Sequence, residues 1–180
     1  MPNDFNGGYP SQYESRLTLK NGREVFFRPV LQTDGPLLVN LFNKLSPQSV
    51  YFRFLRTLHA LTEDLLYRFT HVDYHSSFAL LAVIEEDEKD AVIGVGRYAY
   101  DQHEDATDLA VAVRDDWQNL GLGSSLIEKT IAIGKEHGIF RFVSVMDPGN
   151  NAIRHIFQKF RYKVKYFLRG GFSQVEILVQ

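Results

Sequence analysis

The 180-residue sequence contains no cysteine, no large excess of either charge and no long apolar run. Without cysteine the chain cannot form a disulfide, a zinc–thiolate site or a cysteine nucleophile. Twenty basic and 22 acidic residues give a formal net charge of −2, which disfavours a broad nucleic-acid-binding surface because such a surface needs a basic excess. No apolar stretch reaches the roughly 20 residues of a membrane helix. We therefore expect a cytoplasmic protein that has neither nucleic acid nor membrane as a partner.

The length and the composition predict one domain. Compact domains commonly contain roughly 100–200 residues, and a hydrophobic content of 44% is sufficient for a substantial core. Residues 1–15 contain Asn, Gly, Pro and Ser without an apolar core, so they are interpreted as a flexible tail and not as a signal peptide. Residues 16–180 are expected to form the single domain.

The first part of this domain predicts a hairpin followed by three helices. Asn21 and Gly22 lie between two strand-like runs and tolerate positive φ angles, which is typical of a β-hairpin. Apolar residues then recur every three or four positions after residues that can cap a helix. The predicted capping residues are Thr33 or Asp34, Ser46 and Thr62.

The rest of the chain alternates between strand-like and helical patterns. Three β-rich segments joined by polar turns predict an antiparallel meander that ends with residues 108–113. Helical spacing follows after Gly121, a strand is expected at 140–146, and a second helix begins near Asn150. Two more strands complete the chain. This order predicts an α+β fold with a mixed sheet, in which the segment from 108 to 146 forms a right-handed parallel crossover.

The segment from Gln118 to Ser125 is the most informative about function. It lies between a predicted strand and a predicted helix, and its Gly121 and Gly123 allow the backbone to approach a ligand closely. The first turn of a helix has N–H groups without partners and a partial positive charge, so this loop could hold a diphosphate. No Lys follows the glycines, which excludes a P-loop for nucleoside triphosphates. From these residues alone, a glycine-rich turn that merely starts a helix is an equally good interpretation.

The loop resembles the acyl-CoA loop of GNAT acetyltransferases, whose pattern is Arg or Gln, two residues, Gly, any residue, and Gly or Ala. Gln118, Gly121 and Gly123 match this pattern, and the strand Leu109–Val113 is similar to the strand that precedes the loop in that family. The resemblance implies a GNAT-like fold: a central mixed, mostly antiparallel sheet, helices on both faces, and a parallel strand pair that splays apart. It also implies acetyl-CoA as cosubstrate and no metal.

The resemblance further implies which residues bind the cosubstrate. The pantetheine arm would bond the exposed backbone of the strand, and the diphosphate would lie on the loop. A helix that begins at Asn150 resembles the family's Asn-initiated helix, and Asn150 is at the same time a good helix N-cap. The implied cofactor-binding residues are Val111, Ala112, Val113, Gln118, Asn119, Leu120, Gly121, Leu122, Gly123, Ser124 and Asn150.

One branch of the family is similar to the chain from about Leu17 to Tyr162: the acetyltransferase domain of bacterial Pat-type protein lysine acetyltransferases. The similar segments are Arg28-Pro29, Leu45 to Ser49, Tyr51 to Phe54 and Val72 to Tyr74. This resemblance implies a protein lysine as acceptor. A small amine as acceptor and a non-catalytic acyl-CoA-binding regulatory module are the alternatives, and a homodimer is an open alternative to a monomer.

The chain departs from the Pat pattern at the general base. Pat-type domains have Ala-Glu-Phe-Ala where this chain has Thr107-Asp108-Leu109-Ala110. A lysine amine has a pKa of about 10.4 and must lose a proton before it attacks a thioester. The Asp side chain is one methylene shorter than Glu. Asp108 could still accept this proton through a water molecule that spans the remaining distance. The alternatives are that Asp108 is only a solvated residue, or that Glu104 or Asp105 is the base.

A second departure concerns the group that protonates the leaving thiolate. Many GNAT enzymes have a Tyr on the helix that follows the Asn, whereas this chain has Phe157. A thiol with a pKa near 8.5 leaves readily as a thiolate at neutral pH, so the loss is expected to lower efficiency without preventing the reaction. Both departures add support to the non-catalytic alternative.

Three further patterns have simpler interpretations. Gly94 and Gly96 resemble a dinucleotide fingerprint but are flanked by strands on both sides, so they indicate a bulge or a close contact instead. His71 and His75 have no third ligand and do not predict a metal site. Seven carboxylates could form an acidic rim that attracts lysine-rich segments, or simply two solvated turns. They are Glu85, Glu86, Asp87, Glu88, Asp101, Glu104 and Asp105.

Overall fold

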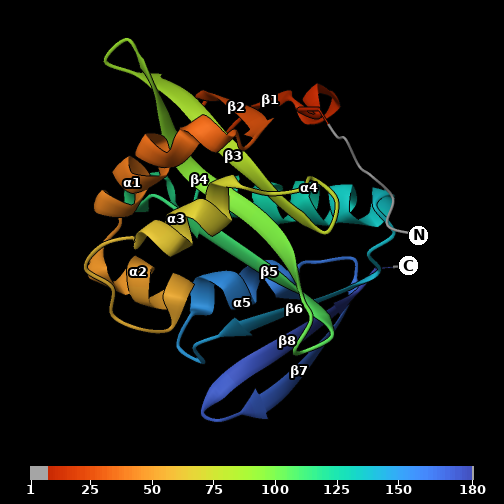
Figure 1. Cartoon of the computed structure of the whole chain (residues 1–180). Coiled ribbons are helices and arrows are strands. Elements are labelled where there is room, and N and C mark those ends of the chain that lie inside the picture. Colours follow the sequence, from red (N-terminus) through yellow and green to blue (C-terminus); the bar gives the residue numbers. More distant parts are fainter. Residues whose placement is uncertain (1–7, 180) are drawn as a thin grey trace.

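A single eight-stranded sheet organises the computed structural model, which describes residues 8–179 (Figure 1). The strand order is β1-β2-β3-β4-β5-β6-β8-β7, and only the β5–β6 pair is parallel. The predicted mixed, mostly antiparallel sheet is therefore confirmed. The strands are β1 (Ser15–Thr18), β2 (Glu24–Pro29), β3 (Ser77–Glu86), β4 (Lys89–Asp101), β5 (Ala106–Val113), β6 (Arg141–Met146), β7 (Lys163–Arg169) and β8 (Phe172–Leu178).

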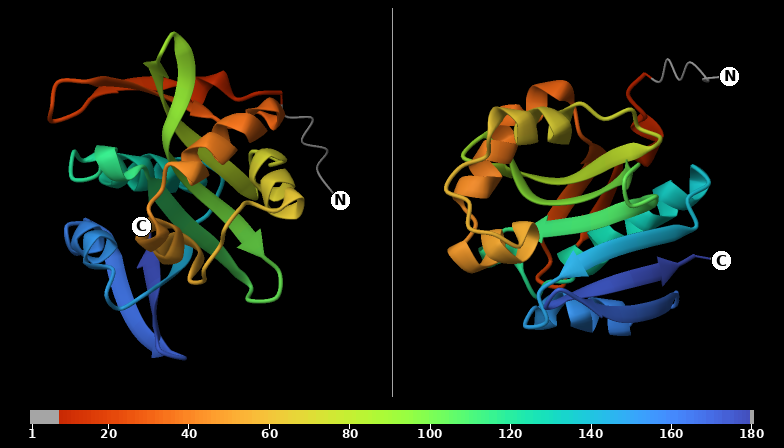
Figure 2. Two further views of the ribbon diagram at one scale, coloured as in Figure 1. Left: turned by 90° about the vertical axis from the view of Figure 1, so that its left-hand side faces the viewer. Right: turned by 60° about the horizontal axis from the view of Figure 1, so that its bottom comes forward.

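Helices cover both faces of this sheet, as expected. Three of them, α1, α2 and α3, lie on one face, while α4 and α5 pack on the opposite face (Figure 2). The bounds are α1 (Gly35–Asn43), α2 (Pro47–Phe54), α3 (Glu63–Thr70), α4 (Leu122–Glu136) and α5 (Asn151–Gln158). The side chains of Ser46 and Thr62 cap α2 and α3, since they accept hydrogen bonds from the N–H groups of Ser49 and Leu65. Both predicted caps are confirmed.

The sheet separates two hydrophobic cores. Because successive side chains of a strand point to opposite faces, β3 sends Leu80 and Ala82 into the larger core beneath α4 and α5, and Leu81 and Val83 into the smaller core beneath α1 and α3. This strand is buried on both faces, which explains its continuous apolar sequence. The face of β3, β4 and β5 that α1 and α3 cover belongs to the smaller core. The candidate site lies at the margin of this core.

Helix α4 packs unusually close to β4. A Cβ atom on Gly94 would lie 2.9 Å from Leu126 Cδ1, and one on Gly96 would lie 2.6 Å from Thr130 Oγ1. The β3–β4 register also shifts between Ala82 and Val83, which indicates a bulge. The two glycines therefore lie in mid-strand at a close contact next to a bulge, and the rejection of a dinucleotide fingerprint is confirmed.

The boundary expected at residue 16 needs correction. Residues 1–7 lie outside the described part of the chain, but residues Ser11–Tyr13 form a short 3-10 helix and β1 already begins at Ser15. The Tyr13 hydroxyl lies 3.0 Å from Nε2 of His137, and its ring contacts Phe78 edge-on. The packed part of the domain therefore begins before residue 16, because Tyr13 contributes to the larger core.

Asp34 precedes α1 but does not cap it. Its carboxylate instead accepts hydrogen bonds from both terminal nitrogens of Arg28, at 2.7 and 2.8 Å, and from the N–H of Leu31 at 2.6 Å. Arg28 is 8% exposed and Asp34 is 3% exposed, so the ion pair is buried. The expected cap at Thr33 or Asp34 is therefore replaced by a buried ion pair that holds the end of β2 to the start of α1.

We expect the substitution Asp34→Ala to lower the free energy of unfolding by about 3–5 kcal/mol, because it leaves the charge of Arg28 buried without a partner. The exposed pair Arg16–Glu24, whose side chains are 65% and 57% exposed, supplies the control. Glu24→Ala should cost no more than about 1 kcal/mol. Urea denaturation of both variants measures the difference, and equal losses would contradict the buried pairing.

Candidate active site

The parallel strands β5 and β6 diverge soon after they pair. Their register contains only Thr107 opposite Phe142 and Asp108 opposite Val143, whereas β5 pairs with β4 along its whole length to Val113. Beyond Asp108, the edge of β5 that faces β6 therefore has no ladder partner. We call this opening between the two strands the fork. The residues with the predicted pantetheine contacts, Val111, Ala112 and Val113, lie along it, and the predicted splay is present.

The loop after β5 presents a row of backbone N–H groups at the open end of the fork. It runs from a short 3-10 helix, Asp115–Trp117, to the start of α4. Gly121 has a φ angle of +89°, a left-handed conformation that favours glycine. Within residues 8–179, the N–H groups of residues 119–124 have no hydrogen-bond acceptor. Free donors at the positive end of a helix are suited to a diphosphate.

Helix α2 holds this loop from the other side. The Asp115 carboxylate accepts hydrogen bonds from the N–H and Oγ of Ser46 and from Oγ of Ser49, at 2.7–2.9 Å. Burial would raise the pKa of Asp115, but these hydrogen bonds outweigh it and lower that pKa. Gln118 donates from Nε2 to the Val113 carbonyl at 3.0 Å and to Ser49 Oγ at 3.2 Å. The Gln118 side chain therefore fixes the loop, and its contact with the cosubstrate stays a prediction.

The same helix also reaches the loop that follows β6. The Tyr51 hydroxyl donates to Asp147 Oδ2 at 3.2 Å, and this hydrogen bond is the main cause that raises the pKa of Tyr51. Helix α2 is thus bonded to the ends of both strands of the fork, as its position beside the end of β6 shows (Figure 1). The sequence analysis did not anticipate that α2 bridges the fork.

Asp108 lies where the fork begins. Its side chain alternates with the buried Leu109, so it points to the face of α1–α3 and lines a pocket of about 360 Å³. Desolvation raises the pKa of Asp108, and the positive charges of Arg53 and Arg97 partly oppose this shift. The pocket is lined by Asp101, Glu104, Ala106, Asp108, Arg141, Val143, Val145, Arg169 and Gln174.

The two alternative bases are already engaged. Glu104 accepts a hydrogen bond from Arg169 at 3.2 Å, and Asp105 accepts one from the Tyr100 hydroxyl at 2.6 Å. The Asp108 carboxylate accepts no hydrogen bond from the residues that the structure describes. Of the three carboxylates, Asp108 is therefore the one without a hydrogen-bond partner among the described residues.

Of the two interpretations of the seven carboxylates, the structure favours two separate turns over an acidic rim. The turn at 85–88 and the turn at 101–105 lie at opposite ends of the 13-residue strand β4, so the seven carboxylates cannot surround one site. Glu86 instead pairs with Arg114 and Lys44, which lower its pKa to about 2. Because Arg141 and Arg169 also line the pocket around Asp108, its charge is mixed.

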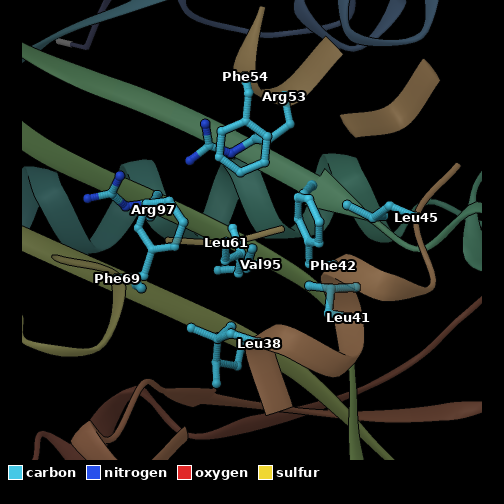
Figure 3. Close-up of a pocket in the computed structure, with 13 residues that line it drawn as sticks. Leu38, Leu41, Phe42, Leu45, Arg53, Phe54, Leu61, Phe69, Val95 and Arg97 are labelled. Carbon is cyan, nitrogen blue, oxygen red and sulfur yellow. The ribbon is translucent and has the colours of Figure 1, made fainter. Parts of the chain in front are cut away.

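Two arginines that were not recognised from the sequence flank Asp108. Arg97 lies opposite Ala110 in the β4–β5 register, two residues along β4 from Ala99, the partner of Asp108, and Arg53 comes from α2. The guanidinium carbons of Arg53 and Arg97 lie 5.7 and 4.9 Å from the ring centre of Phe69. Both residues line a small apolar pocket of about 40 Å³ (Figure 3). The sequence did contain one signal for this pair, because Arg97 occupies a position of β4 whose side chain faces the interior.

Asn150 and Phe157 behave as the sequence suggested. The Asn150 side chain accepts a hydrogen bond from the Ile153 N–H at 3.3 Å, so the predicted N-cap is confirmed, and its role toward the cosubstrate stays a prediction. Phe157 is 2% exposed and packs against Phe160. Within residues 8–179, no three His, Asp or Glu side chains are grouped as metal ligands. None of the helices in that range combines the length and the hydropathy needed to cross a membrane.

The sequence is similar to those of two known acetyltransferases. Over 139 residues the chain is 32% identical to an acetyltransferase of Pseudomonas aeruginosa, covering 77% of this chain and 75% of the relative. It is 30% identical over 145 residues to the acetyltransferase Pat of Mycolicibacterium smegmatis, which covers 79% of this chain but only 42% of Pat. The chain thus spans less than half the length of that relative.

Two solved structures extend the comparison. The GNAT domain of Streptomyces lividans PAT superposes with a TM-score of 0.86 at 28% identity, covering 95% of this chain and all of that one. The structure of yncA from Salmonella typhimurium with its cofactor acetyl-CoA has a TM-score of 0.65 at 16% identity, covering 87% of this chain and 94% of that one, and shows the shared fold alone. The family model of GNAT acetyltransferases matches residues 41–162. With more than half of its length in that match, the chain belongs to the GNAT acetyltransferase family.

Proposed function

We propose that this protein transfers the acetyl group of acetyl-CoA to a lysine side chain of another protein, with Asp108 as the general base. The observation that carries the proposal is the position of Asp108 at the start of the fork, between an open strand edge and a pocket on the face of α1–α3. The open edge of β5 suits the thioester, and the pocket suits the acceptor amine.

A cytoplasmic location and a homodimer stay predictions.

The unpaired backbone groups suit acetyl-CoA. The N–H groups of residues 119–124 would hold the diphosphate, because charged acceptors strengthen such hydrogen bonds. The pantetheine arm would follow the open edge at Val111, Ala112 and Val113, as a strand follows its neighbour. This route ends beside Asp108. A related fold solved with acetyl-CoA supports the assignment.

The chemistry then requires one proton acceptor. Asp108 takes a proton from the acceptor ammonium through a water molecule, and the free amine attacks the thioester carbonyl carbon. The new C–N bond forms as the C–S bond breaks, the thiolate leaves with the electron pair, and the nitrogen releases its second proton to water to give the neutral amide. Phe157 has no proton to donate, so the thiolate is protonated by water, consistent with a thiol pKa near 8.5. Arg53 and Arg97 assist deprotonation because nearby positive charge disfavours an ammonium.

The acceptor is proposed from the relatives. Pat of Mycolicibacterium smegmatis is 30% identical, and the GNAT domain of Streptomyces lividans PAT has the TM-score of 0.86. An acyl-CoA synthetase made as a separate chain is one acceptor that fits this resemblance. A small amine is the second candidate, favoured by the pocket of about 360 Å³ at Asp108, which lies within the usual size range of small-molecule sites.

We expect Gly121→Val to weaken the binding of CoA by at least about 10²-fold, because a side chain over the loop blocks several charge-assisted hydrogen bonds to the diphosphate. Gly138→Val is the matched control. Gly138 lies after the other end of α4 with a φ angle of +81°, so both substitutions introduce the same type of backbone strain. Calorimetry measures both affinities. Equal CoA affinity in the two variants would remove the diphosphate from this loop.

We expect Asp108→Asn to lower kcat by about 10²–10⁴-fold with little change in acetyl-CoA affinity, since only the proton acceptor is lost. Because burial raises the pKa of Asp108, activity in the wild type should be lost on acidification at a pH above the ordinary Asp range. Arg53 and Arg97 oppose that shift and Asp101 adds to it. Glu104→Gln is the control, and a rate loss that follows Glu104 instead would reassign the base. Asp108→Glu restores the family's longer side chain and could raise the rate.

Acetylation of a cell lysate identifies the acceptor class. Incubation with isotope-labelled acetyl-CoA, followed by mass spectrometry, should reveal a few lysines that are labelled by the wild type but not by Asp108→Asn. The inactive variant accounts for non-enzymatic acetylation. Efficient labelling of a free polyamine or amino acid, with no protein above that background, would replace the protein acceptor by a small amine.

A further inference from the structure

Arg53 and Arg97 are two guanidinium groups without an acceptor. In the part of the chain that the structure describes, neither forms a hydrogen bond or an ion pair, and Arg97 Nε is buried without a partner. Their contacts are with aromatic rings: Arg53 lies over Phe54 at 4.9 Å, and both lie over Phe69. Most buried polar groups in proteins are hydrogen-bonded, so an unpaired arginine donor calls for a ligand.

Their surroundings make the pair costly in the absence of such a ligand. Burial and the neighbouring charges of Arg53 and Arg68 lower the pKa of Arg97 to about 10, although the charge of Asp108 opposes this shift. Arg53 and Arg97 thus repel each other, and the carboxylate of Asp108 lies beyond ion-pair distance of both. One negative charge faces two positive charges, and a second negative charge would complete the balance.

The geometry of the two side chains favours one chemical class of ligand. Figure 3 shows both guanidinium groups on the same side of the apolar pocket, with Leu41 and Leu45 on the other. A guanidinium is a rigid planar fork of N–H donors that matches a carboxylate, and stacking on an aromatic ring holds that fork in place. Both forks stack on Phe69, so their N–H edges remain available to an anion.

We propose that Arg53 and Arg97 bind a carboxylate of the acceptor, supplied by an acidic side chain next to the lysine that is acetylated. The proposal rests on the proposed function for its acceptor. In the β4–β5 register Arg97 lies diagonally across from Asp108, where long side chains on one sheet face reach the same ligand. The acceptor amine is then held by Asp108 and the acceptor carboxylate by the two arginines.

This assignment also resolves a conflict in the charge of the site. A lone cationic lysine would approach two unpaired arginines, which repel it. No acidic rim offsets them among the described residues, because the two acidic turns lie at opposite ends of β4. An acceptor that carries both a lysine and a carboxylate brings the compensating charge with it. The arginines therefore act on the choice of acceptor in addition to assisting the proton transfer.

A first experiment tests the anion site without turnover. The Nε–Hε signals of Arg53 and Arg97, assigned by their loss in Arg53→Gln and Arg97→Gln, are followed by NMR while propionate is added to the full chain. We expect both signals to shift with propionate and not with propionamide, while the signal of the exposed Arg161, which lies 5.8 Å from the ring centre of Tyr162, stays in place. No shift, or an equal shift at Arg161, overturns the proposal and assigns the pair to packing on Phe69.

A second experiment measures specificity. Peptides with blocked ends carry one lysine next to either Glu or Gln, and kcat/KM is measured from CoA release. The wild type should prefer the Glu peptides by about 10–100-fold, the effect of a charge-assisted hydrogen bond. Arg53→Gln and Arg97→Gln should reduce the preference to near unity, whereas Arg161→Gln should retain it. An unchanged preference in the first two variants, or no preference in the wild type, contradicts the proposal.

The pH profile tests whether the charge of Arg97 acts on Asp108. Both arginines lower the pKa of Asp108, so Arg97→Gln should move the acidic limb of the activity profile to higher pH, and Arg97→Lys, which keeps the charge, should not.

If only free amino acids are acetylated, with the same dependence on both arginines, the anion site stands and the protein acceptor fails. If protein lysines are acetylated irrespective of neighbouring charge, the reverse holds.

Discussion

The early divergence of β5 from β6 is the constraint on which the rest of the site depends. Two paired residues per strand are enough to fix the direction of the fork at Thr107 and Asp108, and the missing pairs beyond them leave a strand edge for a ligand. An unpaired edge inside a sheet is normally a liability. Here the loop to α4, the helix α2 and the start of α5 all converge on that opening, so each contributes to one site.

Helix α2 connects the two halves of the reaction. Ser46 and Ser49 at its start hold Asp115 and Gln118, Tyr51 reaches Asp147, and Arg53 near its end faces Asp108. A movement of α2 would therefore displace the loop that is proposed to hold the diphosphate and the pocket proposed for the acceptor together. The segment from Leu45 to Phe54 therefore has a physical role, which is to couple the two parts of the site. In the sequence, only its resemblance to the Pat-type domains had singled it out.

Local signals in the sequence predicted local features well. Ser46 and Thr62 are caps because a capping hydrogen bond needs only the next three residues, and Gly121 was identified because its loop precedes a helix. Long-range pairings were not predictable in this way. Asp34 has the sequence position of a cap but finds Arg28 through the fold, and Arg97 becomes notable only when the β4–β5 register places it near Asp108. An acidic rim does not form because the two groups of carboxylates, which are close in sequence, lie at opposite ends of β4.

The separation of the two cores has a consequence for how this protein can change. Leu38 and Leu81 on one face share no cluster with Phe27 and Leu126 on the other, so substitutions in the two sets contribute independently to stability. The face of α1 and α3 can therefore diverge toward a new acceptor while the opposite face keeps its packing intact. Helix α2, which is bonded to both strand ends of the fork, must change in concert with the rest. The two sides of the sheet can therefore evolve separately, except where α2 links them.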